Sequence, residues 1–467
     1  MLSSAQVPPV VAMRLALLLL SLCAALQPAR ADAPLNLPPL VYQQRVLANG
    51  LTVLSLEDHA SPTVAVQLWY RVGSKDDPAG RSGFAHLFEH LMFKRTKYLA
   101  AEQFDRLTED VGGANNASTN DDCTNYLDVV PSNHLERLLW AEAERLQHLT
   151  VDEAAFQSER AVVEEEFRSS VLTPPYGRLY HQLQQETWRV HPYQRPTIGN
   201  IEELEAATLA DVQAFHATYY RPDNAALIVA GDFDQAQLDA WVDRHFGSIA
   251  RPTTAIPRVT AVEPEREADR RVTLHLPNVP LPALGLSWLA PKPDSPDAPA
   301  LQLAVTLLAG GESSRLHQAL VYRLQAAQGV DLIYDETADR GAVYATVLLA
   351  SGQRIAKVEQ ALLAEIDKLA SRPIPPAELD KAKTILLTQR LAGRETNEGR
   401  AEALGSAWIS RGDARAANSE LPALLAVTAA DVQRVVRSEL IRGKRLSLEY
   451  LPEPSTVDGK AAAGAGP

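Results

Sequence analysis

Apolar runs of strand length recur in two separate parts of the chain. Leu51–Leu56 and Val64–Tyr70 are rich in Val and Leu, are separated by a turn at Pro62, and predict two β-strands. Val272–Leu276 and Ala283–Leu289 predict a second pair of the same kind. Each pair is followed by longer segments with helical patterning.

Three of these longer segments are His134–Gln147, Asp152–Phe167 and Pro299–Ala309. The first two have apolar residues at helical spacing, and the third is apolar almost throughout. Hairpins that alternate with long helices favour the α+β class. We therefore expect two domains, each a largely antiparallel sheet covered by helices.

The second half of the chain repeats the first. Thr208–Phe215 recurs as Thr428–Val435, 220 residues later, and each copy has Asp three residues after Thr, which favours a capped helix start. Strand-like runs follow at Ala226–Ala230 and Leu446–Leu451. Shared order and spacing favour an internal duplication over two unrelated helix starts.

These patterns divide the chain into four parts. We expect one domain at residues 40–250, a Pro-rich and charged linker at 251–270, and a homologous domain at 271–452. The tail, residues 453–467, ends in Ala-Ala-Ala-Gly-Ala-Gly-Pro and is expected to be disordered.

The N-terminus has the pattern of a secretory signal peptide. Arg14 precedes the apolar run Leu15–Leu22, and a small-x-small motif ends at Ala31. The run is too short to span a bilayer, so we expect residues 1–31 to be cleaved after Ala31 and the chain to be periplasmic or secreted. Either Met1 or Met13 serves as the start.

Composition and charge limit the classes of molecule that the chain is expected to bind. With 46% hydrophobic and 22% charged residues the chain is typical of globular proteins, and its formal net charge is −13. Residues 1–31 carry two arginines and no acids, so their removal makes the charge −15. This excess of acid argues against nucleic acid or an anionic membrane surface as a partner and is compatible with neutral or cationic peptides. Cys123 would be the one remaining cysteine, which excludes an intrachain disulfide and predicts a small buried side chain.

The run His86-Leu-Phe-Glu89-His90 is the main candidate for chemistry. On a helix, residues four apart share a face, so both imidazoles reach one metal ion at about 2.0–2.1 Å, the usual zinc–nitrogen distance. Glu89 lies on the same side and is placed to take a proton from an attacking water. The order H-x-x-E-H inverts the more familiar H-E-x-x-H.

A third ligand is expected, because catalytic zinc usually has three protein ligands. The predicted helix Asp152–Phe167 contains several acids, and a run of acids on a helix is usually a solvated face. Glu159 and Glu166 are seven residues apart, on one side of that helix, whereas Glu164 and Glu165 point elsewhere. Spacing alone does not choose among them.

These residues resemble those of the inverzincin zinc metallopeptidases, the family of pitrilysin, insulysin and the mitochondrial processing peptidase. The resemblance implies that His86, His90 and Glu166, which lies 76 residues after His90, hold Zn²⁺. It further implies Glu89 as the general base and Glu159 as a partner that orients a ligand histidine.

The resemblance extends over most of the mature chain. The segment Gly112–Thr119 is similar to the family's strand beside the zinc, which implies that Asn116 and Ala117 bind an extended peptide as an added strand. The expected activity is therefore that of a zinc-dependent endopeptidase acting in a chamber between domains. His191-Pro-Tyr193 and Ile198-Gly199 also match family stretches, but turns explain them equally well.

One family feature is out of register. The resemblance implies an arginine and a tyrosine, seven residues apart, after the stretch Ser314-Arg315-Leu316. In this chain the corresponding positions hold Val321 and Gln328. Arg323 and Tyr334 lie nearby with a different separation. The family's chamber is built from four such domains and this chain has two, so we expect a dimer. Our first choice is a hetero-dimer in which a related subunit supplies the arginine and the tyrosine. A non-catalytic scaffold or binding subunit is the alternative, which the intact ligand set disfavours.

Overall fold

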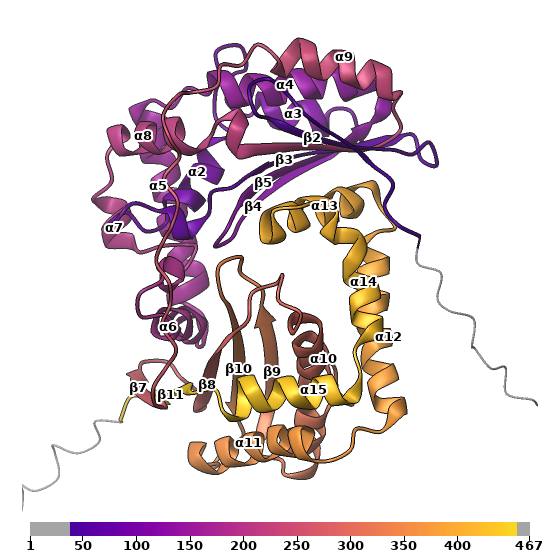
Figure 1. Ribbon diagram of the computed structural model, residues 1–467. Helices are drawn as coiled ribbons and strands as arrows, with labels where there is room; N and C mark the ends of the chain where they lie inside the picture. The colour runs from indigo at the N-terminus through magenta and orange to yellow at the C-terminus, as the bar shows by residue number, and fades with distance from the viewer. Residues whose placement is uncertain (1–37, 455–467) are drawn as a thin grey trace, which may run out of the picture. The chain divides into compact units, whose positions relative to one another are not determined.

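A six-stranded sheet organises the first half of the chain in a computed structural model, which describes residues 38–454. Its strands are β1 (Gln43–Val46), β2 (Thr52–Glu57), β3 (Thr63–Tyr70), β4 (Ala114–Thr119), β5 (Thr124–Pro131) and β6 (Ala225–Gly231). The strand order is β1-β2-β6-β3-β5-β4, and every neighbouring pair is antiparallel except β2 with β6. Strands β2, β3, β5 and β4 of this sheet are labelled in Figure 1. Strand β4 forms one edge.

The second half repeats this plan in five strands. They are β7 (Arg270–Leu276), β8 (Ala283–Ala290), β9 (Ala327–Asp335), β10 (Gly341–Leu349) and β11 (Arg445–Pro452), in the order β7-β11-β8-β10-β9. Here only β7 and β11 are parallel. Each strand from β7 to β11 thus matches one of β2 to β6 in place and direction, which confirms the predicted duplication of an α+β domain.

Helices connect the strands in both halves. The first half contains α2 (Phe84–Leu91), α3 (Gln103–Glu109), α4 (Leu135–His148), α5 (Glu153–Phe167), α6 (Gly177–Thr187), α7 (Ile201–Glu205), α8 (Leu209–Tyr219) and α9 (Gln235–Phe246). The second contains α10 (Ala298–Ala309), α11 (Ile355–Ser371), α12 (Pro376–Gly393), α13 (Asn397–Arg411), α14 (Ala416–Ala426) and α15 (Ala429–Val435). The repeated Thr208 and Thr428 both form capping boxes, with the Asp three residues on, at the starts of α8 and α15.

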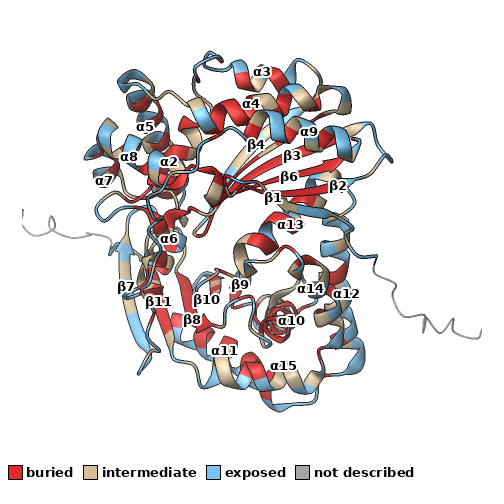
Figure 2. Ribbon diagram, turned by 45° about the horizontal axis from the view of Figure 1, so that its top comes forward, coloured by how far each residue is buried: buried red, intermediate tan, exposed pale blue. Residues whose placement is uncertain are grey.

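Strands β2, β3 and β6 are buried on both faces, which explains why their sequences are apolar at nearly every position (Figure 2). On one face, Val53 and Val229 belong to the same buried cluster as residues of α4 and α9. On the other face, Leu54 and Ile228 pack with Leu404 and other residues of α13. A helix of the second half therefore covers the sheet of the first.

Each half covers the sheet of the other, because α6 of the first half in turn covers the second sheet. Leu179 and Leu183 of α6 share a buried cluster with residues of β8 and β11. The contact between α13 and β3 is close at Gly405, where an added Cβ would lie 2.2 Å from the ring of Trp69. Only glycine fits at that crossing.

A polar junction also joins the halves at two turns. Asp122, in the β4–β5 turn, accepts hydrogen bonds from the Ala338 backbone (2.7 Å) and the Tyr193 hydroxyl (2.6 Å). Lys75 Nζ lies 2.7 Å from Asp122 and 2.8 Å from Asp339, in the β9–β10 turn. The His191-Pro-Tyr193 stretch is therefore a structural part of this junction.

The segment before β7 follows an irregular path that side chains fix in place. Arg221 donates to the Pro252 carbonyl at 2.7 Å. The buried carboxylate of Glu263 accepts hydrogen bonds from three consecutive backbone N–H groups that end at His191. The predicted linker is thus tied to the first half along its length.

Two sequence expectations lie outside the described residues: the signal peptide at 1–31 and the tail from residue 455 onward. Among the helices between residues 38 and 454, none combines the length and apolar character needed to cross a membrane.

Candidate metal centre

Helix α2 carries the H-x-x-E-H residues, and its first turn is fixed by hydrogen bonds and close packing. Asp77 accepts from the backbone N–H groups of Gly83 (2.7 Å) and Ala85 (2.8 Å). Gly83 has φ = 96° and packs against Gly199, where an added Cβ would lie 2.5 Å away, so both positions require glycine. The Ile198-Gly199 stretch is therefore explained by packing against the helix start.

Helix α5 lies against α2 and begins at Asp152, whose carboxylate accepts a hydrogen bond from Ala155 N at 2.9 Å. Its buried residues include Phe156 and Glu159 on the side toward the first half's core. This side of α5 faces α2 and carries both Glu159 and Glu166, which the seven-residue spacing placed on one side of the helix.

The structure brings His86, His90 and Glu166 together. Glu166 Oε2 lies 3.7 Å from His86 Nε2 and 3.5 Å from His90 Nε2, and one ligand atom from each residue falls within 4.8 Å of the others. Tetrahedral zinc with bonds of about 2.0–2.1 Å separates its ligand atoms by roughly 3.4 Å. The donor set therefore fits zinc, and no second group of this kind occurs among residues 38–454.

The two histidines have different electrostatic surroundings. Burial, followed by the neighbouring His90, lowers the pKa of His86 to about 4, which keeps its imidazole in the neutral form that binds metal. Burial alone would lower the pKa of His90 as well, but Glu159, Glu89 and Glu166 outweigh it and raise that pKa.

Glu159 lies behind His90, at a distance. Its Oε2 is 3.8 Å from His90 Nδ1, which is longer than a hydrogen bond, and its Oε1 pairs with Lys94 Nζ at 2.8 Å. Lys94 was not predicted, because a lysine four residues after the second histidine carries no signal in the sequence.

Glu89 is held by a residue that the sequence analysis missed. Thr119 Oγ1 donates a hydrogen bond to Glu89 Oε2 at 2.5 Å, and burial raises the pKa of the carboxyl. Thr119 lies two residues after Ala117, so it shares that residue's face of β4. The alternation of side chains along the strand could have pointed to Thr119. That inference would have required knowing that β4 passes beside α2.

The predicted substrate-binding residues lie on an edge strand. Within residues 38–454, strand β4 pairs only with β5, so its other side is open in this part of the chain. Asn116 is exposed and Ala117 is partly buried, and the Ala117 N–H donates to Asn116 Oδ1 at 2.9 Å.

The structure does not bring Arg323 or Tyr334 to this cluster. Arg323 pairs with Glu365 at 3.2 Å, and the Tyr334 hydroxyl donates to the Pro291 carbonyl at 2.5 Å, so both are engaged within the second half. Cys123 is buried, which confirms the prediction of a small buried side chain, and burial raises the pKa of its thiol.

Comparisons with known proteins agree on the family. Residues 52–201 match the family described as "Insulinase (Peptidase family M16)", and residues 206–386 match "Peptidase M16 inactive domain". The chain is similar to "Zinc protease PqqE" of Helicobacter pylori, with 33% identity over 347 residues that cover 73% of this chain and 78% of that one. It is also similar to "Probable mitochondrial-processing peptidase subunit beta, mitochondrial" of Arabidopsis thaliana, with 24% identity over 398 residues (83% of this chain, 74% of that one).

Solved structures share the fold. A protease from Helicobacter pylori superposes with a TM-score of 0.85 at 28% identity, covering 89% of this chain and all of that one. The first half of the periplasmic protease PqqL from Escherichia coli superposes with a TM-score of 0.72 at 18% identity, covering 89% and 93%. Matching families along both halves and a relative above 30% identity lead to one conclusion: the chain belongs to peptidase family M16.

Proposed function

We propose that this chain is an exported zinc-dependent endopeptidase that cleaves peptides bound in extended form. The observation that carries the proposal is the convergence of His86, His90 and Glu166 next to the carboxylate of Glu89. Two imidazoles and a carboxylate, with a fourth position free, are typical of catalytic zinc. Zinc held there would supply Lewis-acid polarisation of the scissile carbonyl and lower the pKa of a water.

Glu89 is the general base in this proposal. The Thr119 hydrogen bond occupies Oε2 and fixes the carboxylate, which leaves Oε1 to accept a proton from the attacking water and pass it to the leaving amine. Glu159 and its partner Lys94 stabilise the surroundings of His90.

The substrate lies along β4. An extended peptide that adds to this open edge forms backbone hydrogen bonds, which do not depend on side chains and so suit broad specificity. Asn116 and Ala117 contribute the central contacts. The acidic balance of the chain favours neutral or cationic peptides.

The proposed catalytic domain is residues 40–250, and residues 271–452 form a non-catalytic partner domain. In α10, the counterpart of α2, no residue is a metal ligand. Because Arg323 and Tyr334 are engaged elsewhere, we favour a dimer in which a related subunit supplies the Arg/Tyr pair. A relative named as the beta subunit of a processing peptidase supports a two-subunit arrangement.

The proposed location is the periplasm or the exterior. The N-terminal pattern of Arg14, the apolar run and Ala31 supports cleavage of residues 1–31. The similarity in fold to a protein described as a periplasmic protease is consistent with this location.

The test combines metal analysis with peptide hydrolysis by the purified mature chain. We expect about one zinc per chain, cleavage of peptides followed by mass spectrometry, and loss of cleavage with retained zinc in Glu89→Gln. The matched control is Glu165→Gln, an exposed acid on α5, which should remain active. Full activity in Glu89→Gln would contradict the mechanism. A zinc-loaded chain that is inactive both alone and with a related subunit would favour the scaffold alternative.

A further inference from the structure

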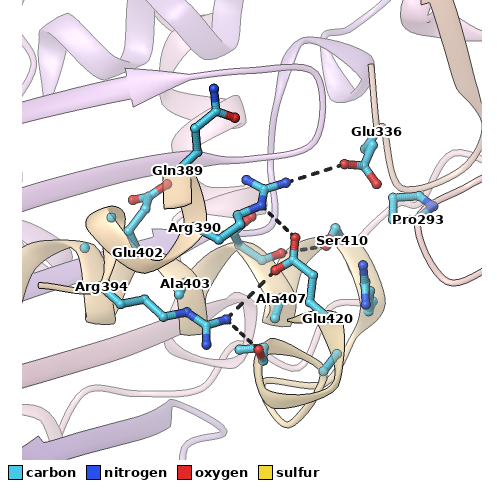
Figure 3. Close-up of a pocket in the computed structure, with 16 residues that line it drawn as sticks. Pro293, Glu336, Gln389, Arg390, Arg394, Glu402, Ala403, Ala407, Ser410 and Glu420 are labelled. Atoms are coloured by element: carbon cyan, nitrogen blue, oxygen red, sulfur yellow. Dashed lines mark hydrogen bonds and ion pairs between the residues drawn. The ribbon is translucent and has the colours of Figure 1, made fainter. Parts of the chain in front are cut away.

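Charged side chains line a cavity of about 310 Å³ among α12, α13 and α14 of the second half (Figure 3). They interact with the wall itself: Arg390 Nε lies 2.8 Å from Glu420, and Arg394 donates to the Ala417 carbonyl at 2.7 Å. Such contacts shape the cavity and do not single out a ligand class. The ion pair of Lys94 with Glu159, beside the metal centre, has a more specific consequence.

The acidic side of α5 faces a row of three residues at four-residue steps in and after α2. Glu166 Oε2 lies 3.7 Å from His86 Nε2 and 3.5 Å from His90 Nε2. Glu159 lies 3.8 Å from His90 Nδ1 and 2.8 Å from Lys94 Nζ. Of these four contacts, only that of Lys94 with Glu159 is short enough for a hydrogen bond. This ion pair therefore connects the two segments that carry the proposed ligands, and it needs no metal to form.

Lys94 is placed by the turn that follows α2. Its backbone N–H donates to the Leu91 carbonyl at 3.0 Å, which keeps the residue about one turn beyond His90. The side chain of Glu159 is 7% exposed and that of Lys94 is 27% exposed. A pair that is largely shielded from water contributes more than a surface pair, and removal of one partner leaves the other charge buried and unpaired.

Lys94 also offsets a local excess of negative charge. Three carboxylates, those of Glu89, Glu159 and Glu166, act on His90 from nearby. Within residues 38–454, the ion pair with Lys94 is the one that any of these three forms with a lysine or arginine. Like charges that are close together repel, so without Lys94 the carboxylate of Glu159 would be driven toward water and away from its place behind His90.

We propose that Lys94 is a positioning residue, which holds α5 against the histidine-bearing segment through Glu159 and so pre-arranges Glu166 and both histidines for zinc. The proposal rests on the proposed zinc site and adds to it a residue outside the ligand set. Phe156 and Val163 of α5 are buried in the core of the first half. Loss of the ion pair should therefore loosen the alignment of α5 and leave the fold in place.

The test is the zinc affinity of the purified mature chain, measured by competition with a chelator. We expect Lys94→Met to weaken binding by about tenfold, the lower end of the range for partners outside the ligand shell. Lys94→Arg keeps the charge and the pairing and should stay within about threefold of the parent. Lys97→Met removes the same charge from an exposed lysine three residues on and should bind as the parent does.

The sign of the effect separates positioning from simple charge. Removal of a nearby positive charge by itself strengthens the attraction for a divalent cation. Equal or tighter zinc binding in Lys94→Met would therefore overturn the proposal. Because Lys94 acts through Glu159, adding Lys94→Met to Glu159→Gln should change the affinity by less than about twofold. Losses that simply add in the double variant would also overturn it.

Hydrogen exchange followed by mass spectrometry gives a readout that does not depend on activity. After removal of metal with a chelator, α5 should exchange faster in Lys94→Met than in the parent, whereas α9 should be unchanged and so report that the variant is folded. Lys94→Gln gives the same comparison if Lys94→Met does not fold. A parent chain that binds no zinc would overturn the proposed function as well, whereas unaltered affinity and exchange in the variant would overturn this inference alone.

Discussion

The hydroxyl of Thr119 donates a 2.5 Å hydrogen bond to Glu89 Oε2 and so connects the last residue of β4 to the helix that carries both histidines. The strand proposed to hold the substrate and the proposed base are thereby fixed relative to each other. A shift of the strand along its edge would also move the carboxylate.

This contact makes Thr119→Val a specific test. Loss of the hydroxyl should lower kcat by at least about tenfold, because a hydrogen bond to a charged group contributes about 1.5–3 kcal/mol, while KM and zinc content stay near the parent values. Thr119→Ser keeps the donor and should restore most of kcat. Steady-state kinetics with metal analysis would measure both. An unchanged kcat in Thr119→Val would show that Glu89 is positioned without this bond.

Glu166→Gln should weaken zinc binding. The substitution keeps the size of the side chain and removes the charge of the proposed ligand oxygen, which lies 3.5 Å and 3.7 Å from the two histidine nitrogens. Loss of a partner outside the ligand shell costs about 10–100-fold in metal affinity, so loss of a ligand should cost at least that much. Competition with a chelator measures the affinity. Glu165→Gln is the control, and equal affinities in the two variants would rule out Glu166 as a ligand.

Asp121, which precedes Asp122 of the polar junction in the β4–β5 turn, should make stability depend on pH. Burial, and then Asp335, raise the pKa of its carboxyl to about 8, even though Ser74 donates to it at 2.8 Å. The folded state therefore holds this proton more tightly than the unfolded state, so stability should fall as pH rises from about 4 to about 8.

Asp121→Asn removes that titration. We expect it to be more stable than the parent by at least about 1 kcal/mol at pH 8 and little different at pH 4, as measured by urea unfolding. Asp110→Asn, an exposed change on the same half, should leave the pH dependence unaltered. The same pH slope in Asp121→Asn and the parent would argue against this assignment.

Tyr193→Phe should loosen the junction between the halves. The hydroxyl donates to Asp122 at 2.6 Å and accepts from the Asp339 backbone at 3.0 Å, so its removal leaves buried polar groups unpaired at a cost of about 1–3 kcal/mol. Urea unfolding would detect this loss. Tyr180→Phe removes a hydroxyl from a side chain that is 59% exposed and should have almost no effect. Equal losses in the two variants would mean that the junction adds no stability.

Much of the fold follows from local pattern. The apolar runs of β2, β3 and β8 were predicted within about two residues, because strands buried on both faces leave an uninterrupted signal. Strand β7, whose residues are exposed or half-buried, was also predicted within about two residues. The repeated Thr-x-x-Asp starts of α8 and α15 were predicted as well, since capping depends only on neighbours in sequence. Strand order and the covering of each sheet by a helix of the other half were not predicted, because they depend on contacts between distant segments.

The candidate site also contains residues that local sequence pattern predicts and residues that it does not. The approach of His86 and His90 follows from helical spacing. Glu166 followed only from the family resemblance, because periodicity placed it on one side of the helix with Glu159 but did not show that this side meets the histidines. Thr119 and Lys94 were missed, since each acts across a contact between elements that no spacing in the sequence encodes.

The reciprocal placement of α6 and α13 has a consequence for cutting the chain. A polypeptide that stops in the segment 251–269 would leave Leu54 and Ile228 uncovered, and the remaining piece would lack α6 over its own strands. Each fragment alone should therefore aggregate, whereas the two expressed together should reassemble without a covalent connection. The intact chain therefore corresponds to two complementing fragments joined by the segment 251–269.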